Sequence, residues 1–140
     1  MLEAIVLAAV MILPSDGVNA QERIANTQIG YHESLYKGKW YHKKWERSRK
    51  CIMDRESIHN YKAANRSSSA RGAYQFLDSQ WRESLVWMML REGGNRKEMQ
   101  SLRNKSIHQW SRYYQDRAFF TAWRHGEGRH HWAYPGSRCY

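Results

Sequence analysis

Large apolar side chains recur at helical spacing along this chain, and this pattern constrains its fold more than any other feature. One set lies between residues 78 and 91: Trp81, Leu85, Met88 and Met89. A second set lies between residues 111 and 124: Tyr114, Ala118, Phe119, Ala122 and Trp123. Such spacing places each set along one face of a helix. No stretch alternates apolar and polar residues for long enough to predict a sheet. We therefore expect a mainly α fold, α+β at most, with a short irregular hairpin between residues 60 and 76.

Capping residues mark the ends of the predicted helices. Asp78 or Ser79 can begin the first one, which continues to about Arg91 and stops before two glycines. Residues 106–109 have the S-x-x-Q form of a capping box. Gly126 can end the last helix.

The length and charge of the chain suit one basic domain behind a short leader. The chain has 140 residues and a formal net charge of +10, and a domain of this size can bury a substantial core. Its seven Trp, nine Tyr and three Phe suit a core, a sugar-binding cleft or both. A basic domain attracts polyanions, and both nucleic acid and the acidic polymers of a bacterial wall fit this charge.

Residues 1–20 resemble a signal peptide. The apolar run over residues 4–13 is too short to span a bilayer, Pro14 breaks it, and residues 18–20 offer small residues for cleavage. Glu3 stands where a signal peptide is normally positive. We interpret the segment as a leader for export. A misassigned start site and an uncleaved interfacial segment are the alternatives.

Residues 21–39 are interpreted as a linker that passes into a basic aromatic segment. The basic aromatic pattern continues to Lys50, and it fits either a packed helix with a basic outer face or a flexible basic arm. We favour a helix from about Trp40 through Ile58. Its apolar face would carry Trp45, Ile52 and Met53. The folded domain then spans residues 40–140.

Cys51 and Cys139 are the two cysteines of the chain. An even number of cysteines in an exported chain favours one disulfide, although two separate thiols also fit. No C-x-x-C pair is present to bind a metal. His125, His130 and His131 cluster near the C-terminus, but no carboxylate or cysteine completes a zinc site at a useful spacing. We expect no metal and no organic cofactor.

Residues 56–76, ESIHNYKAANRSSSARGAYQF, carry the strongest functional pattern. Cleavage of a glycosidic bond requires a carboxylic acid that protonates the leaving oxygen, and near neutral pH such an acid needs a raised pKa. Glu56 would lie in the last turn of its helix, where the negative end of the helix dipole disfavours a carboxylate. Ile58, Tyr74 and Phe76 could supply an apolar pocket. For an isolated glutamate, the ordinary interpretation is a surface ion pair with a neighbouring arginine.

The pair of patterns E-S-x-x-N-Y-x-A-x-N and S-x-x-G-A-Y-Q-F resembles the motif of lytic transglycosylases. It is most similar to the transglycosylase-like domain of resuscitation-promoting factors and related actinobacterial or phage wall-cleaving proteins, over about residues 51–81. That family is lysozyme-like, so the resemblance implies a small lysozyme-like domain in which Glu56 is the catalytic acid. The positions that it implies as supporting or substrate-binding are Ser57, Asn60, Asn65, Tyr74, Gln75 and Tyr114. Gln75 fits a buried structural amide equally well, and Tyr114 fits a core position.

The resemblance also implies a disulfide between Cys51 and Cys139, because the family places one cysteine ahead of the glutamate and one near the C-terminus. A loop of this length would stabilise the fold by roughly 4–5 kcal/mol in the chain-entropy model. The chain departs from the family at residues 58–59, where Ile-His replaces a glycine pair, and in the spacing of Cys51 from Glu56.

A second catalytic carboxylate is missing from the pattern. Asp54 would point to another helix face, and Asp78 and Asp116 are interpreted as helix-start residues. Hydrolases that retain or invert configuration usually need two carboxyl groups, so a single glutamate favours a lytic transglycosylase that cleaves the MurNAc–GlcNAc β-1,4 bond.

Two alternatives stay open. Within the same class, the chain could be a hydrolytic lysozyme or a phage muramidase that penetrates the wall. From another class, it could be a non-catalytic basic module that binds wall glycans or nucleic acid. We expect peptidoglycan strands and acidic wall polymers as partners, rather than nucleic acid, and a monomeric protein. Its expected location is secreted, at the cell wall, or in a virion if a phage encodes it.

Overall fold

A computed structural model describes residues 31–136 and 138–140. The described part is mainly helical, as predicted. Its α-helices are α2 (Glu46–Ser57), α3 (Asp78–Arg91), α4 (Arg96–Arg103) and α5 (Arg112–Trp123). Its 3-10 helices are η1 (Lys43–Trp45), η2 (Ile107–Gln109), η3 (Arg124–Gly126) and η4 (Arg129–Trp132). Two short antiparallel strands, β1 (Ala70–Arg71) and β2 (Phe76–Leu77), pair Ala70 with Leu77 and Arg71 with Phe76. The predicted signal peptide lies outside the described residues.

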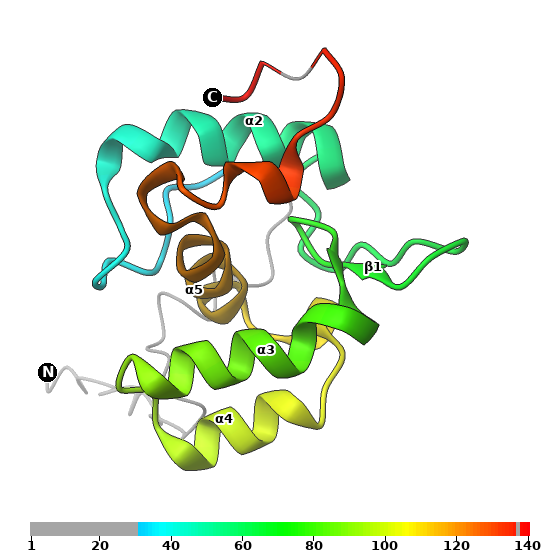
Figure 1. Ribbon diagram of the computed structural model, residues 1–140. Helices are drawn as coiled ribbons and strands as arrows, with labels where there is room; N and C mark the ends of the chain where they lie inside the picture. Colours follow the sequence, from blue (N-terminus) through cyan, green and yellow to red (C-terminus); the bar gives the residue numbers. More distant parts are fainter. Residues whose placement is uncertain (1–30, 137) are drawn as a thin grey trace, which may run out of the picture.

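Helix α5 forms the centre of the fold. Ten of its twelve residues are buried, and α2 crosses it on one side while α3 and α4 lie side by side on the other (Figure 1). The Phe119 ring stacks on Tyr74 with centroids 4.7 Å apart and on Trp123 at 5.5 Å. Trp132 of the C-terminal segment packs on the same Phe119 ring at 5.0 Å. The dense aromatics of the sequence therefore form the core.

The predicted helix ends agree with the structure in most places. Helix α3 spans Asp78–Arg91, and the capping box joins Ser106 and Gln109. Asp78 is the first residue of α3 and Leu77 is its cap, so neither residue predicted as the cap has that role. Asp78 instead accepts a hydrogen bond of 2.7 Å from the backbone of Ile107.

Two features of the helices differ from the sequence prediction. Helix α4 was not predicted, because its eight residues bury only Met99 and Leu102. The helix expected from about Trp40 begins later, with the short η1 turn and then α2 at Glu46. Its C-terminal end agrees, since Ile58 leaves the helix in the left-handed region.

The end of the predicted linker belongs to the folded domain. Ser34 and Tyr36 are buried. The backbone N–H of Leu35 donates to Asp116 at 3.1 Å, and that of Ser34 donates to Glu46 at 3.1 Å. A domain boundary at residue 40 is therefore too late, because residues from about 34 onward are held by buried carboxylates of α2 and α5.

A buried ionic network joins α2 to α5. The Arg49 guanidinium donates to Glu46 at 2.9 Å and to the Tyr74 hydroxyl at 2.8 Å, and it lies 3.3 Å from Asp116. The hydroxyls of Tyr61 and Tyr74 donate to the same Asp116 oxygen at 2.5 and 2.6 Å. Asp116 is fully buried within α5, so its interpretation as a helix-start residue is wrong.

The predicted disulfide is confirmed. Cys51 and Cys139 are bonded, with their Cα atoms 5.3 Å apart and 88 positions between them in sequence. The bond fixes the C-terminal segment, which follows α5 from residue 124 onward, to the middle of α2. None of the helices in the described ranges is long and apolar enough to cross a membrane.

Candidate functional site

A cleft of about 350 Å³ lies where the C-terminal end of α2 meets the β1–β2 hairpin, the start of α3 and the C-terminal segment. Its lining residues are Glu56, Asn65, Ser68, Ala70, Gln75, Phe76, Leu77, Trp81, His131, Trp132 and Tyr134. Glu56 is the one carboxylate among them. Three of the residues predicted from the motif, Glu56, Asn65 and Gln75, thus line the same cleft.

Glu56 lies in the last turn of α2, as predicted, with a side chain that is 12% exposed. Arg55 donates to its Oε1 atom at 3.2 Å. Tyr134 lines the cleft beside the same carboxylate. Burial raises the pKa of Tyr134, and the negative charge of Glu56 raises it further, so this phenol stays protonated beside the carboxylate at neutral pH.

Arg55 connects the end of α2 to the C-terminal segment. Its guanidinium donates to the Trp132 carbonyl at 2.6 Å and lies 4.4 Å from the centre of the Tyr134 ring. It also approaches the Cys139 sulfur at 4.0 Å. These contacts, together with the disulfide, hold the C-terminal segment against the cleft and place Tyr134 beside Glu56.

The backbone turns sharply directly after Glu56. Ile58 and His59 have φ values of 53° and 59°, in the left-handed region that favours glycine. The His59 imidazole pairs with Asp54, one turn back on α2, and this hydrogen bond lowers the pKa of Asp54. The His59–Asp54 pair thus joins this strained turn to the preceding helix.

Ser57 and Asn60 support the site from outside the cleft lining. The Ser57 hydroxyl donates to the Ala73 carbonyl at 2.8 Å and accepts from the backbone N–H of Asn60 at 3.1 Å. The Asn60 side chain accepts from the backbone of Lys62 at 2.9 Å. Ser57 therefore fastens the end of α2 to the hairpin turn, Asn60 stabilises the loop that follows α2, and neither residue is in the cleft lining.

The hairpin presents Gln75 to the cleft. Gln75 has a φ of 50°, and its amide donates to the Gly72 carbonyl at 3.0 Å. Gln115 of α5 holds the turn in place, because its side-chain oxygen accepts from the N–H of Ala73 at 3.0 Å. The Gln115 amide also donates to the carbonyls of Tyr61 and Trp110. Gln75 thus combines both roles considered for it, as a structural amide and a cleft residue.

Asn65 lies in the exposed loop that leads into β1. Its side-chain oxygen accepts from the backbone N–H of Ser67 at 2.8 Å, and its own N–H donates to the Ala70 carbonyl at 3.0 Å. These bonds hold the conformation of the polar loop, and Asn65 contributes to the outer edge of the cleft.

Two predicted substrate-binding tyrosines lie elsewhere. Tyr74 is 1% exposed, and its hydroxyl bonds Asp116 and Arg49 in the core. Tyr114 lines a different cavity, of about 450 Å³, where its hydroxyl bonds Glu98. Neither residue lines the cleft. Tyr74 points into the core from the turn between β1 and β2, and Tyr114 faces α4.

The aromatic wall of the cleft was missed by the motif. Trp81 of α3 packs edge-on to His131 at 4.5 Å, and His131 lies 4.0 Å from His130. Burial and the neighbouring His130 lower the pKa of His131. The helical spacing indicated a core position for Trp81, and no pattern in the C-terminal segment pointed to a cleft.

The described residues contain no group of three or more His, Cys, Asp and Glu that could hold a metal ion. Comparisons with protein-family models, with curated proteins and with solved structures found no match. The assignment of residues 56–76 to a wall-cleaving motif therefore stays a prediction.

Proposed function

We propose that this chain is a lytic transglycosylase that cleaves the MurNAc–GlcNAc β-1,4 bond of peptidoglycan, with Glu56 as its acid and base. The observation that carries the proposal is the cleft, which combines one shielded carboxylate with amide and indole groups. The resemblance of residues 56–76 to the motif of wall-cleaving enzymes supplies the substrate.

The lining of the cleft suits a sugar. A pyranose presents apolar C–H faces and polar edges, so it is bound by aromatic rings together with amide groups. Trp81 and Trp132 give the cleft an aromatic side, while Gln75 and Asn65 give it amides. Gln75 is held by its bond to Gly72, so its remaining amide oxygen can accept from a sugar hydroxyl.

Glu56 carries both proton transfers in the proposed reaction. In its protonated form, it donates a proton to the glycosidic oxygen as the bond from that oxygen to C1 of MurNAc breaks. The resulting carboxylate then accepts the proton of the C6 hydroxyl, while the C6 oxygen bonds to C1 and closes a 1,6-anhydro ring. No water is consumed, and Glu56 ends protonated as it began.

The contacts of Glu56 suit the second half of this reaction. Arg55 donates to its carboxylate, which is the form that must remove the C6 proton, and Tyr134 lies beside it. Among the residues that line the cleft, none supplies a second carboxylate that would activate water. Two-carboxylate hydrolysis is therefore the less favoured chemistry.

The proposal places the protein outside the cytoplasm, at the wall or in a virion. The Cys51–Cys139 disulfide is compatible with an oxidising compartment.

Digestion of purified peptidoglycan, followed by mass analysis of the muropeptides, tests the proposal. We expect anhydro-muropeptides from the wild type and a loss of activity of at least about 100-fold in Glu56→Gln, since general acid–base catalysis contributes on this scale. Products with reducing ends would instead show a hydrolytic lysozyme.

The matched control is Glu98→Gln, which neutralises a carboxylate in the larger cavity beside Tyr114. This variant is expected to keep its activity. If Glu98→Gln were inactive while Glu56→Gln cleaved normally, the active site would lie in the cavity beside Tyr114 and the proposed cleft would be wrong. Absence of cleavage by the wild type would favour a non-catalytic binding module.

A further inference from the structure

A group of cations gathers at the N-terminal end of α2, at the opposite end of this helix from Glu56. We call this surface the basic face. Its members are Lys39, Lys43, Lys44, Arg47 and Arg124. All five are exposed. Arg124 comes from the end of α5, and its guanidinium lies 5.3 Å from the Trp40 ring centre, which brings it to the segment that carries the lysines.

The charge of the basic face is not neutralised within the described part of the chain. None of the ion pairs found there involves any of its five cations. The nearby carboxylates are engaged elsewhere, because Glu46 binds Arg49 and Glu92 accepts from Trp40 and Thr121. Glu127, three residues after Arg124, forms no ion pair with it.

Crowding like charges without counter-charges raises the free energy of the folded state and creates a strongly positive local potential. A polyanion relieves this repulsion, and release of its condensed counter-ions adds to the binding free energy. The basic face therefore fits a polymer with regularly spaced negative charges better than a single small anion.

The aromatic residues of the basic face indicate which polyanion it fits. Trp40 already contacts Lys39 at 4.9 Å, Arg124 at 5.3 Å and His125 at 5.2 Å. Trp45 contacts Lys44 at 4.9 Å and packs on Trp123. Proteins that bind single-stranded nucleic acid offer aromatic rings on which bases stack. Both indole rings are already in contact with cations, and Trp45 also packs against Trp123, so they leave little surface on which bases could stack. The basic face therefore favours a polyanion without bases.

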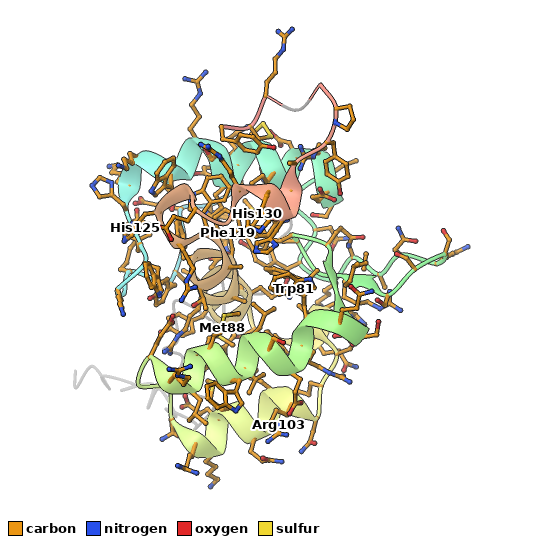
Figure 2. The ribbon with its side chains drawn as sticks, in the orientation of Figure 1. Trp81, Met88, Arg103, Phe119, His125 and His130 are labelled. Carbon is orange, nitrogen blue, oxygen red and sulfur yellow. A yellow bond between two sulfur atoms is a disulfide. The ribbon has the colours of Figure 1, made fainter. Side chains whose placement is uncertain are left out.

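We propose that the basic face binds a phosphodiester polymer of the cell wall, of the poly(glycerol phosphate) kind. The proposal rests on the proposed function, which places the protein at a wall. Glu46 and Glu56 are separated by about 15 Å along the axis of α2. Figure 2 shows His125 toward the N-terminal end of α2, away from Trp81 at the cleft. One polymer can thus hold the protein while the cleft stays open to a glycan strand.

Binding of poly(glycerol phosphate) to the double variant Lys43→Gln/Lys44→Gln tests the proposal. At about 0.1 M salt we expect the affinity to fall roughly tenfold. Each lost cation is expected to lower the slope of log Kd against log salt by about 0.7, as for single-stranded polyanions. Both side chains are exposed, and circular dichroism checks that the variant is folded.

Two control proteins separate the basic face from other causes. Lys97→Gln/Lys105→Gln removes the same charge from the rim of the larger cavity and is expected to bind like the wild type. Glu56→Gln is also expected to bind normally. An equal loss of affinity in the Lys97→Gln/Lys105→Gln protein would show that binding depends only on the net charge of the protein, and this result would overturn the proposal. Tighter binding of a single-stranded oligonucleotide than of poly(glycerol phosphate), lost in Lys43→Gln/Lys44→Gln, would overturn it in favour of nucleic acid.

Digestion of two wall preparations separates this proposal from the proposed function. The Lys43→Gln/Lys44→Gln variant should digest walls that carry the polymer several-fold more slowly than the wild type, and walls stripped of it at the same rate. If no preparation is cleaved by any protein but the polymer-binding loss remains, the basic face stands and the proposed enzymatic function fails. If cleavage is normal and the variant binds the polymer like the wild type, the polymer-binding role of the basic face is overturned while the proposed enzymatic function stands.

Discussion

Left-handed backbone conformations concentrate at the two surfaces to which we assign a role. Within residues 31–136 and 138–140, the residues other than glycine with positive φ are Ile58, His59, Gln75, Arg124 and His125. The first three flank the cleft and the last two lie at the basic face. A left-handed conformation costs an L-residue roughly 1–2 kcal/mol, and strained residues of this kind often mark functional segments. Ile58 is the most unusual of them, because its side chain is β-branched and 81% exposed.

Replacement of Ile58 by glycine is expected to stabilise the protein. The change removes the left-handed strain, while the added freedom of glycine in the unfolded state costs about 0.5–1 kcal/mol. The net gain in the free energy of unfolding should be about 0.5–1 kcal/mol. Urea denaturation of the wild type and of Ile58→Gly measures it.

The control for this prediction is Ile58→Ala, which removes the same exposed side chain but keeps the Cβ atom. Alanine keeps the Cβ atom that causes most of the left-handed strain and loses only the additional crowding of the β-branch, so this variant should recover less than half of the gain. An equal gain from alanine would mean that relief of exposed apolar surface, rather than of backbone strain, explains the effect.

At the scale of secondary-structure elements, the β1–β2 turn depends on a close contact with α5. Gly72 has a φ of 81°, and a Cβ atom placed on it would lie 2.4 Å from the Gln115 side-chain oxygen. The same oxygen accepts from the Ala73 N–H. A side chain at position 72 would therefore push the turn away from α5 and displace Gln75 from the cleft.

Gly72→Ala is expected to cost more than the backbone conformation alone can explain. The matched variant is Gly93→Ala, because Gly93 has a similar φ of 90° but no atom within 4 Å of its added Cβ. We expect about 1 kcal/mol of destabilisation for Gly93→Ala, and about 1–3 kcal/mol more for Gly72→Ala from overpacking. Equal costs in denaturant titrations would show that Gln115 moves aside freely.

The connection between α2 and α5 depends on the buried charge of Arg49. Arg49→Met would leave Glu46 without its cation and Asp116 with only the more distant Arg112, at 3.8 Å, and breaking a buried pair in this way typically costs 3–5 kcal/mol. Arg47→Met serves as the control, because Arg47 is an exposed residue of the same helix. Its stability should change by less than about 0.5 kcal/mol. Thermal and urea unfolding of both variants test this difference, and similar losses would argue against the network.

At the scale of the whole molecule, the buried tyrosines make stability sensitive to alkaline pH. Burial raises the pKa of Tyr61 and of Tyr74, and the neighbouring Asp116 carboxylate raises both further. In the unfolded chain these phenols ionise near about pH 10. The folded state retains the protons that the unfolded state releases, so their contribution to stability is complete below about pH 10 and is lost as the pH rises toward the folded pKa values.

Each of these tyrosines should lower the free energy of unfolding by about 1.4 kcal/mol per pH unit above about pH 10. Tyr74→Phe should therefore reduce the alkaline slope by this amount, whatever its effect on stability at neutral pH. Urea titrations between about pH 9 and 11.5 measure the slope. Tyr140→Phe, at an exposed position, should leave it unchanged, and an unaltered slope in Tyr74→Phe would contradict the prediction.

Much of the architecture could be predicted from local patterns. The spacing of apolar residues in α3 and α5 and the capping box at Ser106 depend on neighbours within a few positions, and the structure has all three. Helix α4 was missed because eight residues give too short a pattern. The disulfide was predicted from the cysteine count together with the family resemblance, since the two cysteines are 88 positions apart and have no local pairing signature.

By itself, the sequence determined the mainly helical content, the course of α3 and α5 and the candidate acid Glu56, because each depends on residue types at short separation. Only the tertiary structure decided which side chains surround Glu56. It placed Tyr74 in the core and Tyr114 at another cavity, and brought Trp81 and Tyr134 to the cleft instead. The physical reason is that the cleft wall comes from segments whose relative placement is set by the packing of α5, the disulfide and the Arg55 contacts, which no local pattern encodes.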